Sequence, residues 1–203
     1  PAADPADPES ILVTAWQPEG ASDLALFRST HSGADWQPLA LPDGGVPVTW
    51  AGDGGRRIAA ALADGALVRS DDGGQSWAYV AQRLPVTSMA WDDRGTLYAG
   101  TNGRGVYRLA AGGTPLELSA PQDELSSARI VGLAVAGERL FAATPTTVFF
   151  IQQVDGAPLP DAWTKTAPVP DRVTALAAAN EDTLYVGTAL NGVLKSADAG
   201  KSW

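Results

Sequence analysis

A tryptophan recurs along this sequence at a nearly constant interval. Trp36 and Trp77 are 41 residues apart and Trp163 and Trp203 are 40 apart, while the 86 residues from Trp77 to Trp163 make two periods of 43. In residues 86–109 and 173–196, two apolar runs flank a polar turn, and a third run follows a turn containing glycine. A fourth strand would follow the tryptophan position. Four antiparallel strands every 40 to 43 residues is the period of a propeller blade.

The segments between the tryptophans favour strands over helices. Glycine (22 residues) and proline (15 residues) interrupt the chain at short intervals, and no window carries the apolar stripe of an amphipathic helix. We therefore predict an all-β chain, a β-propeller of four-stranded antiparallel blades with about five blades visible. The expected segments are a flexible Pro/Ala/Asp linker at 1–10 and blades at about 11–42, 46–83, 86–120, 130–168 and 173–203.

The first and last of these blades are expected to be incomplete. No candidate for an innermost strand precedes Ile11, and the sequence stops at Trp203, where an outermost strand would begin. Folded proteins avoid long unpaired sheet edges. We therefore expect these residues to be part of a longer chain that forms a six- or seven-bladed ring. The alternative is a five-bladed ring closed by unusual strand pairing or by another subunit.

A short motif follows the third strand in two of the expected blades, 46–83 and 173–203. Residues 70–77 (SDDGGQSW) and 196–203 (SADAGKSW) both fit S-x-D-x-G-x-x-W. Residues 29–36 (STHSGADW) form a third copy, with His31 in place of the aspartate. On these residues the chain resembles the Asp-box, or BNR-repeat, β-propellers. That group includes sialidases, some endoglucanases, sortilin-type receptors and photosystem II stability/assembly factors.

The motif has a structural interpretation. An aspartate at a tight turn accepts hydrogen bonds from nearby backbone N–H groups, glycine supplies an unusual dihedral, and tryptophan fills the space between sheets. The resemblance also implies that these boxes lie on outer hairpins, away from the usual active-site face. We therefore predict architectural roles for Ser70, Asp72, Gly74, Trp77, Ser196, Asp198, Gly200, Trp203, Ser29, Gly33 and Trp36.

Composition excludes several functions. With 14 basic and 23 acidic side chains the chain carries a formal charge of -9, which argues against nucleic-acid binding. No uninterrupted apolar run reaches the roughly 18 residues that a membrane span requires. The absence of cysteine and the single histidine make a metal centre or a Ser-His-Asp triad improbable. We expect no metal and no cofactor, and we assign no catalytic residue.

Basic residues recur at one position of the repeat. Arg83, Arg129 and Arg172 each come shortly before the expected innermost strand of a blade, and Asn102 with Arg104 stands on a loop of the same face. If these loops are equivalent, the guanidiniums would converge and hold a carboxylate or phosphate. The resemblance implies two precedents: sialidases bind a sugar carboxylate with an arginine triad, and the assembly factors present a basic patch to a partner. The alternative is a repeated surface arginine paired with local acids such as Asp171.

Two functions from different classes remain open. The first is a non-enzymatic scaffold or assembly factor that binds another protein or a protein complex. The second is a carbohydrate-active or glycan-binding propeller, for which the candidate carboxylates are Asp43, Asp64, Asp123 and Glu124. The tyrosines fall inside expected strands and are interpreted as packing residues. The Pro/Ala/Asp segment that begins at Pro1 is typical of a tether after an export signal or lipid anchor, so we expect an extracytoplasmic location.

Overall fold

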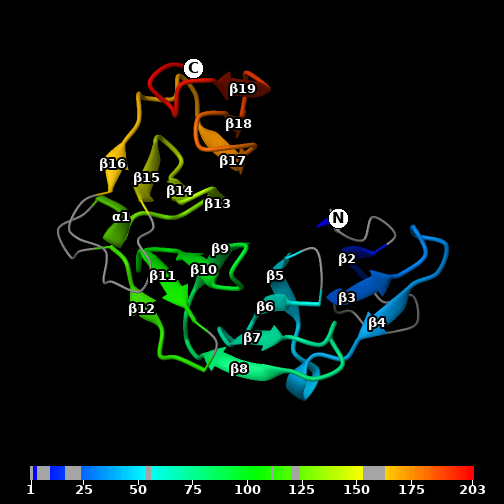
Figure 1. The fold of residues 1–203 in the computed structure, drawn as a ribbon. Helices are drawn as coiled ribbons and strands as arrows, with labels where there is room; N and C mark the ends of the chain where they lie inside the picture. Colours follow the sequence, from blue (N-terminus) through cyan, green and yellow to red (C-terminus); the bar gives the residue numbers. More distant parts are fainter. Residues whose placement is uncertain are drawn as a thin grey trace. The chain divides into compact units, whose positions relative to one another are not determined.

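The computed structural model describes residues 2–3, 10–16, 24–53, 56–110, 112–119, 124–152 and 163–203. The part of the chain that it describes is almost entirely β-strand (Figure 1), as the sequence predicts. The exceptions are a single helical turn, α1 (Glu124–Ser127), and a short 3-10 helix at Pro42–Gly44. The strands form two compact units, Pro1–Leu84 and Pro85–Trp203, which are described separately.

The first unit contains two antiparallel sheets in which neighbours in sequence are neighbours in space. Their orders are β1-β2-β3-β4 and β5-β6-β7-β8. The strands are β1 (Ala2–Ala3), β2 (Ile11–Trp16), β3 (Leu24–Ser29), β4 (Gln37–Leu39), β5 (Pro47–Gly52), β6 (Ile58–Leu62), β7 (Leu67–Ser70) and β8 (Ala78–Ala81).

The second unit contains three sheets of the same kind, with orders β9-β10-β11-β12, β13-β14-β15-β16 and β17-β18-β19. The strands are β9 (Val86–Trp91), β10 (Leu97–Thr101), β11 (Val106–Leu109), β12 (Leu116–Glu117), β13 (Gly132–Ala136), β14 (Arg139–Ala143), β15 (Val148–Gln152), β16 (Thr164–Lys165), β17 (Val173–Ala178), β18 (Leu184–Thr188) and β19 (Val193–Ser196).

The structure differs from the sequence prediction at the N-terminal end. Ala2 pairs with Leu12 and Ala3 with Ile11, so β1 joins the first sheet where we expected only a linker. Two alanines carry no alternating pattern of side chains, and the sequence therefore gave no sign of a strand there. The last sheet has three strands in the described residues.

Strand alternation gives each sheet two faces, and the two faces have different neighbours. We call the face that packs on the following sheet its trailing face and the opposite face its leading face. In the sheet β9–β12, Tyr98 and Val106 lie on the trailing face and belong to one core cluster with Leu140, Ala142 and Phe149 of the next sheet. These five side chains are buried, which removes apolar surface from water between the two sheets.

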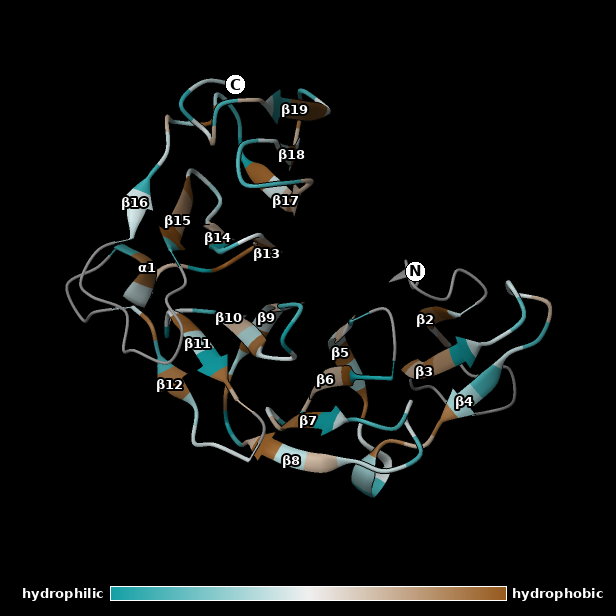
Figure 2. Cartoon of the chain, viewed as in Figure 1, coloured by the Kyte–Doolittle hydropathy of each residue, from teal (hydrophilic) through white to brown (hydrophobic). Residues whose placement is uncertain are grey.

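The same arrangement recurs one sheet further along. Phe141 and Val148, on the trailing face of β13–β16, share a cluster with Leu184, Val186 and Leu194 on the leading face of β17–β19. In the first unit, Leu12 and Leu26 on the trailing face of β1–β4 cluster with Ile58 of the next sheet. Figure 2 shows hydrophobic residues on the strands and hydrophilic residues in many of the turns that join them.

Phe141 tests how much this packing between sheets contributes to stability. Its side chain is fully buried between two sheets, so Phe141→Ala is expected to lower the free energy of unfolding by about 3–5 kcal/mol. Leu190→Ala is the control, because Leu190 is 88% exposed and its loss should change stability by less than about 0.5 kcal/mol. Urea denaturation followed by tryptophan fluorescence measures both. Equal losses for the two variants would contradict the packing described.

Candidate functional site

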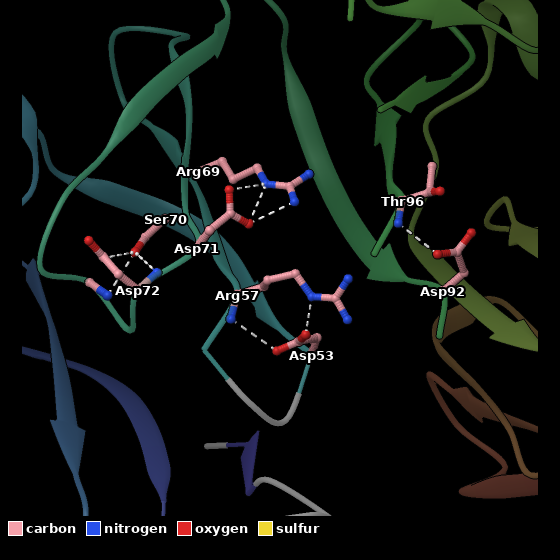
Figure 3. Close-up of polar contacts among 9 residues, drawn as sticks. Asp53, Arg57, Arg69, Ser70, Asp71, Asp72, Asp92 and Thr96 are labelled. Atoms are coloured by element: carbon pink, nitrogen blue, oxygen red, sulfur yellow. Dashed lines mark hydrogen bonds and ion pairs between the residues drawn. The ribbon is translucent and has the colours of Figure 1, made fainter. Parts of the chain in front are cut away.

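The two full copies of the S-x-D-x-G-x-x-W motif form hydrogen-bonded turns. After β7, the Ser70 hydroxyl accepts the N–H of Gly74 at 2.8 Å and donates to Asp72 Oδ1 at 2.8 Å (Figure 3). Asp72 Oδ1 also accepts the backbone N–H groups of Gln75 and Ser76, each at 2.9 Å, and Oδ2 accepts the Ser76 hydroxyl. These donors stabilise the ionised carboxylate, with the Ser76 hydroxyl the strongest, and hold the pKa of Asp72 well below its usual range.

The copy after β19 repeats this geometry. The Ser196 hydroxyl accepts the N–H of Gly200 at 2.8 Å and donates to Asp198 Oδ1 at 2.8 Å. Asp198 in turn accepts the hydroxyl of Ser202 at 2.6 Å and its backbone N–H at 2.9 Å. These bonds, led by the Ser202 hydroxyl, lower the pKa of Asp198 to about 2.

The degenerate copy keeps the turn with different side chains. The Ser29 hydroxyl accepts the N–H groups of Gly33 at 2.8 Å and His31 at 3.2 Å, as its counterparts do. His31 Nδ1 lies 3.0 Å from Asp35 Oδ1. Asp35 occupies the position of Ser76 and Ser202, so the carboxylate of the pair has moved from the third to the seventh residue of the motif. This exchange explains how the turn tolerates the loss of the usual aspartate.

The two full-motif turns, at 70–77 and 196–203, also contact the preceding sheet: a Cβ on Gly74 would lie 2.9 Å from the Leu39 side chain. Gly200 has a φ of 83°, and a Cβ placed there would lie 2.5 Å from Thr166 Cγ2, so glycine is required both by the dihedral and by the close approach. The Trp203 indole donates to the Ala167 carbonyl at 3.1 Å, and Trp163 donates to the Leu118 carbonyl at 3.1 Å. These contacts support an architectural role for the motif.

Arg129 and Arg172 line one pocket in the second unit. The pocket has a volume of about 260 Å³ and is formed where β9, β13 and β17 begin. Both arginines are exposed, and each comes just before an inner strand, as the sequence analysis expected. The remaining lining residues are Thr87, Ile130, Val131, Pro145, Val173 and Thr174.

Backbone pairing places Asn102 beside Arg129. Asn102 and Arg129 form an isolated antiparallel bridge, and on either side of it Ile130 donates to the Thr101 carbonyl at 3.0 Å and Gly103 to the Ala128 carbonyl at 3.1 Å. Arg104 stands on the same loop, where its backbone N–H donates to Thr101 Oγ1 at 3.0 Å. Four of the five predicted binding residues therefore belong to the second unit, and two of them line the pocket.

Arg83 belongs to the first unit. It has a φ of 57° and lies beside Gly65, whose carbonyl accepts the N–H of Leu84 at 3.0 Å. The structure therefore brings two of the three repeated arginines to one pocket, and the part played by Arg83 stays a prediction.

The Asp171 carboxylate does not pair with the Arg172 guanidinium. Asp171 Oδ2 accepts the backbone N–H groups of Leu190 at 2.7 Å and Asn191 at 3.0 Å, and Oδ1 accepts the backbone N–H of Arg172 at 2.6 Å. These backbone donors, with Leu190 the strongest, lower the pKa of Asp171. Across the described ranges, neither Arg129 nor Arg172 forms a side-chain ion pair. The alternative prediction, in which Asp171 neutralises the Arg172 side chain, is therefore wrong.

Two threonines that the sequence analysis did not single out also line the pocket. Thr87 donates its hydroxyl to the Ile130 carbonyl at 2.6 Å and so joins β9 to the segment that follows Arg129. Thr174 is exposed at the start of β17. One feature of the sequence could have identified these two threonines: the same Val-Thr pair opens both inner strands, at 86–87 and 173–174.

The candidate glycosidase carboxylates have local partners. Asp43 accepts the Tyr79 hydroxyl at 2.6 Å, Asp64 accepts the N–H of Ala66 at 2.9 Å, and Glu124 pairs with Lys165 at 2.7 Å. Asp123 lies outside the described residues.

Several other polar groups of the described residues lie in turns or in the core. Asp92 accepts the N–H of Thr96 at 2.6 Å, and Asp53 pairs with Arg57 in the turn between β5 and β6 (Figure 3). Tyr98 is 3% exposed, and its burial, with a smaller effect of Asp92, raises its pKa to about 12. A tyrosine that ionises so reluctantly is a poor nucleophile.

Neither a cluster of metal ligands nor a membrane-spanning helix occurs among the described residues. No group of three or more His, Cys, Asp or Glu side chains gathers as a metal site would require. No described helix is long and apolar enough to cross a membrane.

Comparisons with known proteins identify the fold. No protein-family model matches the sequence, and no curated protein sequence matches it. Among solved structures, YCF48 bound to D1 peptide is similar with a TM-score of 0.62 and 17% identity over 89% of this chain and 60% of that one. The GH74 xyloglucanase from Xanthomonas campestris has a TM-score of 0.70 and 19% identity over 99% of this chain and 37% of that one.

A third similar structure is PorZ, described as a bacterial surface component of the type-IX secretion system of Porphyromonas gingivalis. It has a TM-score of 0.60 and 16% identity over 85% of this chain and 24% of that one. The chain thus spans 60% of YCF48 and smaller shares of the other two. At these identities the likenesses show the fold, and together with the sheets they define an all-β chain of the β-propeller class.

Acid is expected to destabilise the two motif turns. The pKa of Asp198 is about 2 in the folded protein against an ordinary 3.8, so the turn contributes stability above about pH 3.8 that is lost as the pH falls towards 2. The lowered pKa of Asp72 acts in the same direction. The double variant Asp72→Asn with Asp198→Asn should unfold at a lower temperature near neutral pH, and its melting temperature should fall less steeply in acid. Asp93→Asn, on an exposed turn, is the control. An acid slope equal to that of the wild type would contradict this account.

Proposed function

We propose that this protein is a non-enzymatic Asp-box β-propeller that binds another protein, as an interaction scaffold or assembly factor, through the pocket of Arg129 and Arg172. One observation carries the proposal. The two arginines stand one repeat apart in the sequence, line the same pocket and form no ion pair within the described ranges. Two neighbouring guanidiniums that have no carboxylate partner among the described residues favour binding of an added anion.

The chemistry of the pocket suits a carboxylate. A guanidinium presents several N–H donors in a planar fork, which matches the two oxygens of a carboxylate group. The backbone fixes both arginines, since Arg129 bridges to Asn102 and Arg172 precedes the first residue of β17. The volume of about 260 Å³ admits a side chain or a chain terminus rather than a folded surface. An acidic segment of a partner protein is therefore the expected ligand.

The resemblances support the same function. The turns at Ser70 and Ser196 have the hydrogen bonds that an Asp box would require, and the structurally similar YCF48 was solved with a bound peptide. An extracytoplasmic location also belongs to the proposal, and the likeness to a bacterial surface component agrees with it.

A carbohydrate-active function is the second candidate, and the likeness to a GH74 xyloglucanase favours it. Against it, Asp43, Asp64 and Glu124 are each occupied by a local partner. Incubation with xyloglucan and with a sialoside, followed by measurement of released reducing ends or sialic acid, is expected to give no release above the blank. Release that increases with the amount of protein would make this the better assignment.

Replacement of the two arginines tests the proposed partner site. A fluorescent peptide rich in glutamate should bind to the wild type, and Arg129→Gln with Arg172→Gln should weaken its binding at least tenfold, because hydrogen bonds to charged groups contribute about 1.5–3 kcal/mol each. Fluorescence anisotropy measures the affinity. Lys195→Gln removes an equally exposed charge from β19, and it should bind as the wild type does. Unchanged affinity in the double arginine variant would refute the proposal.

A further inference from the structure

Five pairs of described residues have an aspartate or asparagine followed by glycine, and they differ in what the glycine N–H does. In four pairs it donates to a backbone carbonyl: Gly44 to Leu41 at 3.3 Å, Gly65 to Leu62 at 2.9 Å, Gly73 to Arg56 at 2.7 Å and Gly103 to Ala128 at 3.1 Å. The fifth pair is Asn191 with Gly192, and there the glycine N–H donates no hydrogen bond within the described residues.

The form of the loop leaves this N–H without an acceptor. The loops from β10 to β11 and from β18 to β19 are closed by the same backbone bond: Thr101 N–H to the Gly105 carbonyl at 3.1 Å, and Thr188 N–H to the Gly192 carbonyl at 2.8 Å. In the first loop the Gly105 N–H likewise donates to no described acceptor, and Arg104 before it is exposed, as Asn191 is. The sheet that carries this first loop packs on a following sheet. The unbonded N–H and the exposed side chain before it therefore belong to the loop, not to the place of its sheet in the chain.

An asparagine followed by glycine can react with its own backbone. Asparagine is among the thermolabile residues of proteins. The nitrogen of the next residue can attack the side-chain Cγ, and glycine has no side chain to hinder that approach. A nitrogen whose N–H is held by a carbonyl must first lose that bond, so pairing protects the asparagine. Among the described residues there are two asparagine–glycine pairs, and this difference favours reaction at Asn191 over Asn102.

The two asparagines are also held differently. Asn102 forms a backbone bridge with Arg129, and hydrogen bonds between backbone groups flank the bridge on both sides. The Asn191 side chain is held by one printed bond, in which its amide Nδ2 donates to Asp171 Oδ2 at 3.1 Å. Asn191 is exposed, and a single side-chain hydrogen bond in water contributes little net stability. Its side chain can therefore rotate towards the Gly192 nitrogen without opening a sheet.

We propose that Asn191 is a site of spontaneous deamidation. The Gly192 nitrogen loses its proton to hydroxide and attacks Asn191 Cγ. The new N–Cγ bond closes a succinimide ring, and the Cγ–Nδ2 bond breaks, so that Nδ2 leaves as ammonia after taking a proton from water. A further water molecule adds to one of the two ring carbonyls and opens the ring, which gives aspartate or isoaspartate at position 191. Hydroxide and water are the co-reactants of both steps.

The product disturbs the loop in which it forms. The Asn191 amide donates to Asp171 Oδ2, whereas a carboxylate has no proton to donate. Asp171 is ionised at neutral pH, because backbone donors, with Leu190 the strongest, lower its pKa. Two carboxylates would then face each other where a hydrogen bond stood, and like charges so close repel. Since Asp171 also accepts the N–H groups of Arg172 and Leu190, this repulsion should loosen the link between the loop and the segment before β17.

The reaction rates at the two asparagine–glycine pairs test the proposal on the whole chain. The protein is incubated in warm, mildly alkaline buffer, and mass spectrometry of tryptic peptides follows the conversion of amide to acid, with Asn102 and Asn191 on different peptides. In the folded protein Asn191 should react about fivefold faster than Asn102, because a backbone hydrogen bond must first break at Gly103. In urea the two rates should become nearly equal, since the fold is what distinguishes the pairs. A folded-state rate at Asn102 equal to or above that at Asn191 would overturn the proposal, and so would an Asn191 that reacts in urea but stays an amide in the folded protein.

The variant Asn191→Asp tests the effect of the product on the loop. It places a carboxylate opposite Asp171, so its melting temperature near neutral pH should be lower than that of the wild type. Asn102→Asp is the matched control, because it adds the same charge to the loop that carries Arg104, beside Arg129, and removes no bond to a carboxylate. Its melting temperature should stay close to that of the wild type. Equal melting temperatures for the two variants would overturn the repulsion from Asp171.

Discussion

The packing of one sheet on the next is the interaction on which the rest of this structure depends. A sheet whose apolar face has no neighbour leaves that face in water, and covering it with another sheet is favourable. Here Phe141 and Val148 are buried only because Leu184, Val186 and Leu194 of the next sheet lie against them. The order of the sheets therefore fixes which loops become neighbours, and the loops carry the charged groups.

The motif turns strengthen this packing at the edges of the sheets β5–β8 and β17–β19. Hydrogen bonds join Ser196, Asp198 and Ser202 within the turn and stabilise its conformation. Gly200 then approaches Thr166, and the Trp203 indole donates to the Ala167 carbonyl of the preceding sheet. Turn and tryptophan thus act together, which explains why they recur together in the sequence.

Much of this was predictable from the sequence, because the repeat encodes local structure. The inner strands β9 and β17 begin at Val86 and Val173, where the apolar runs begin, and the motif serines end β7 and β19. Arg129 and Arg172 both stand before inner strands in the sequence, and they line one pocket because these strands belong to adjacent sheets.

Other features depend on contacts that no local pattern records. Asp171 Oδ2 accepts N–H groups of the turn at 190–191, which only the fold brings near, and the alternative pairing of Asp171 with Arg172 does not occur. The strand at Ala2–Ala3 is defined by its pairing with β2 and not by its own residues. The exposure of Tyr185 and Val193 follows from the absence of a covering sheet among the described residues, whereas their sequence matches that of buried equivalents.

The central claim is that packing of the inner strands creates an anion-binding pocket at Arg129 and Arg172. Nuclear magnetic resonance of the ¹⁵N-labelled protein, titrated with a glutamate-rich peptide, tests it most directly. The account predicts that the shifted amide signals centre on Thr87, Ile130, Val131, Val173 and Thr174, with the arginine Nε–H signals of Arg129 and Arg172 moving in parallel. The chain has another pocket, whose lining includes Lys165 and Lys201. Shifts that centre on that pocket and leave the signals named above unchanged would contradict the account.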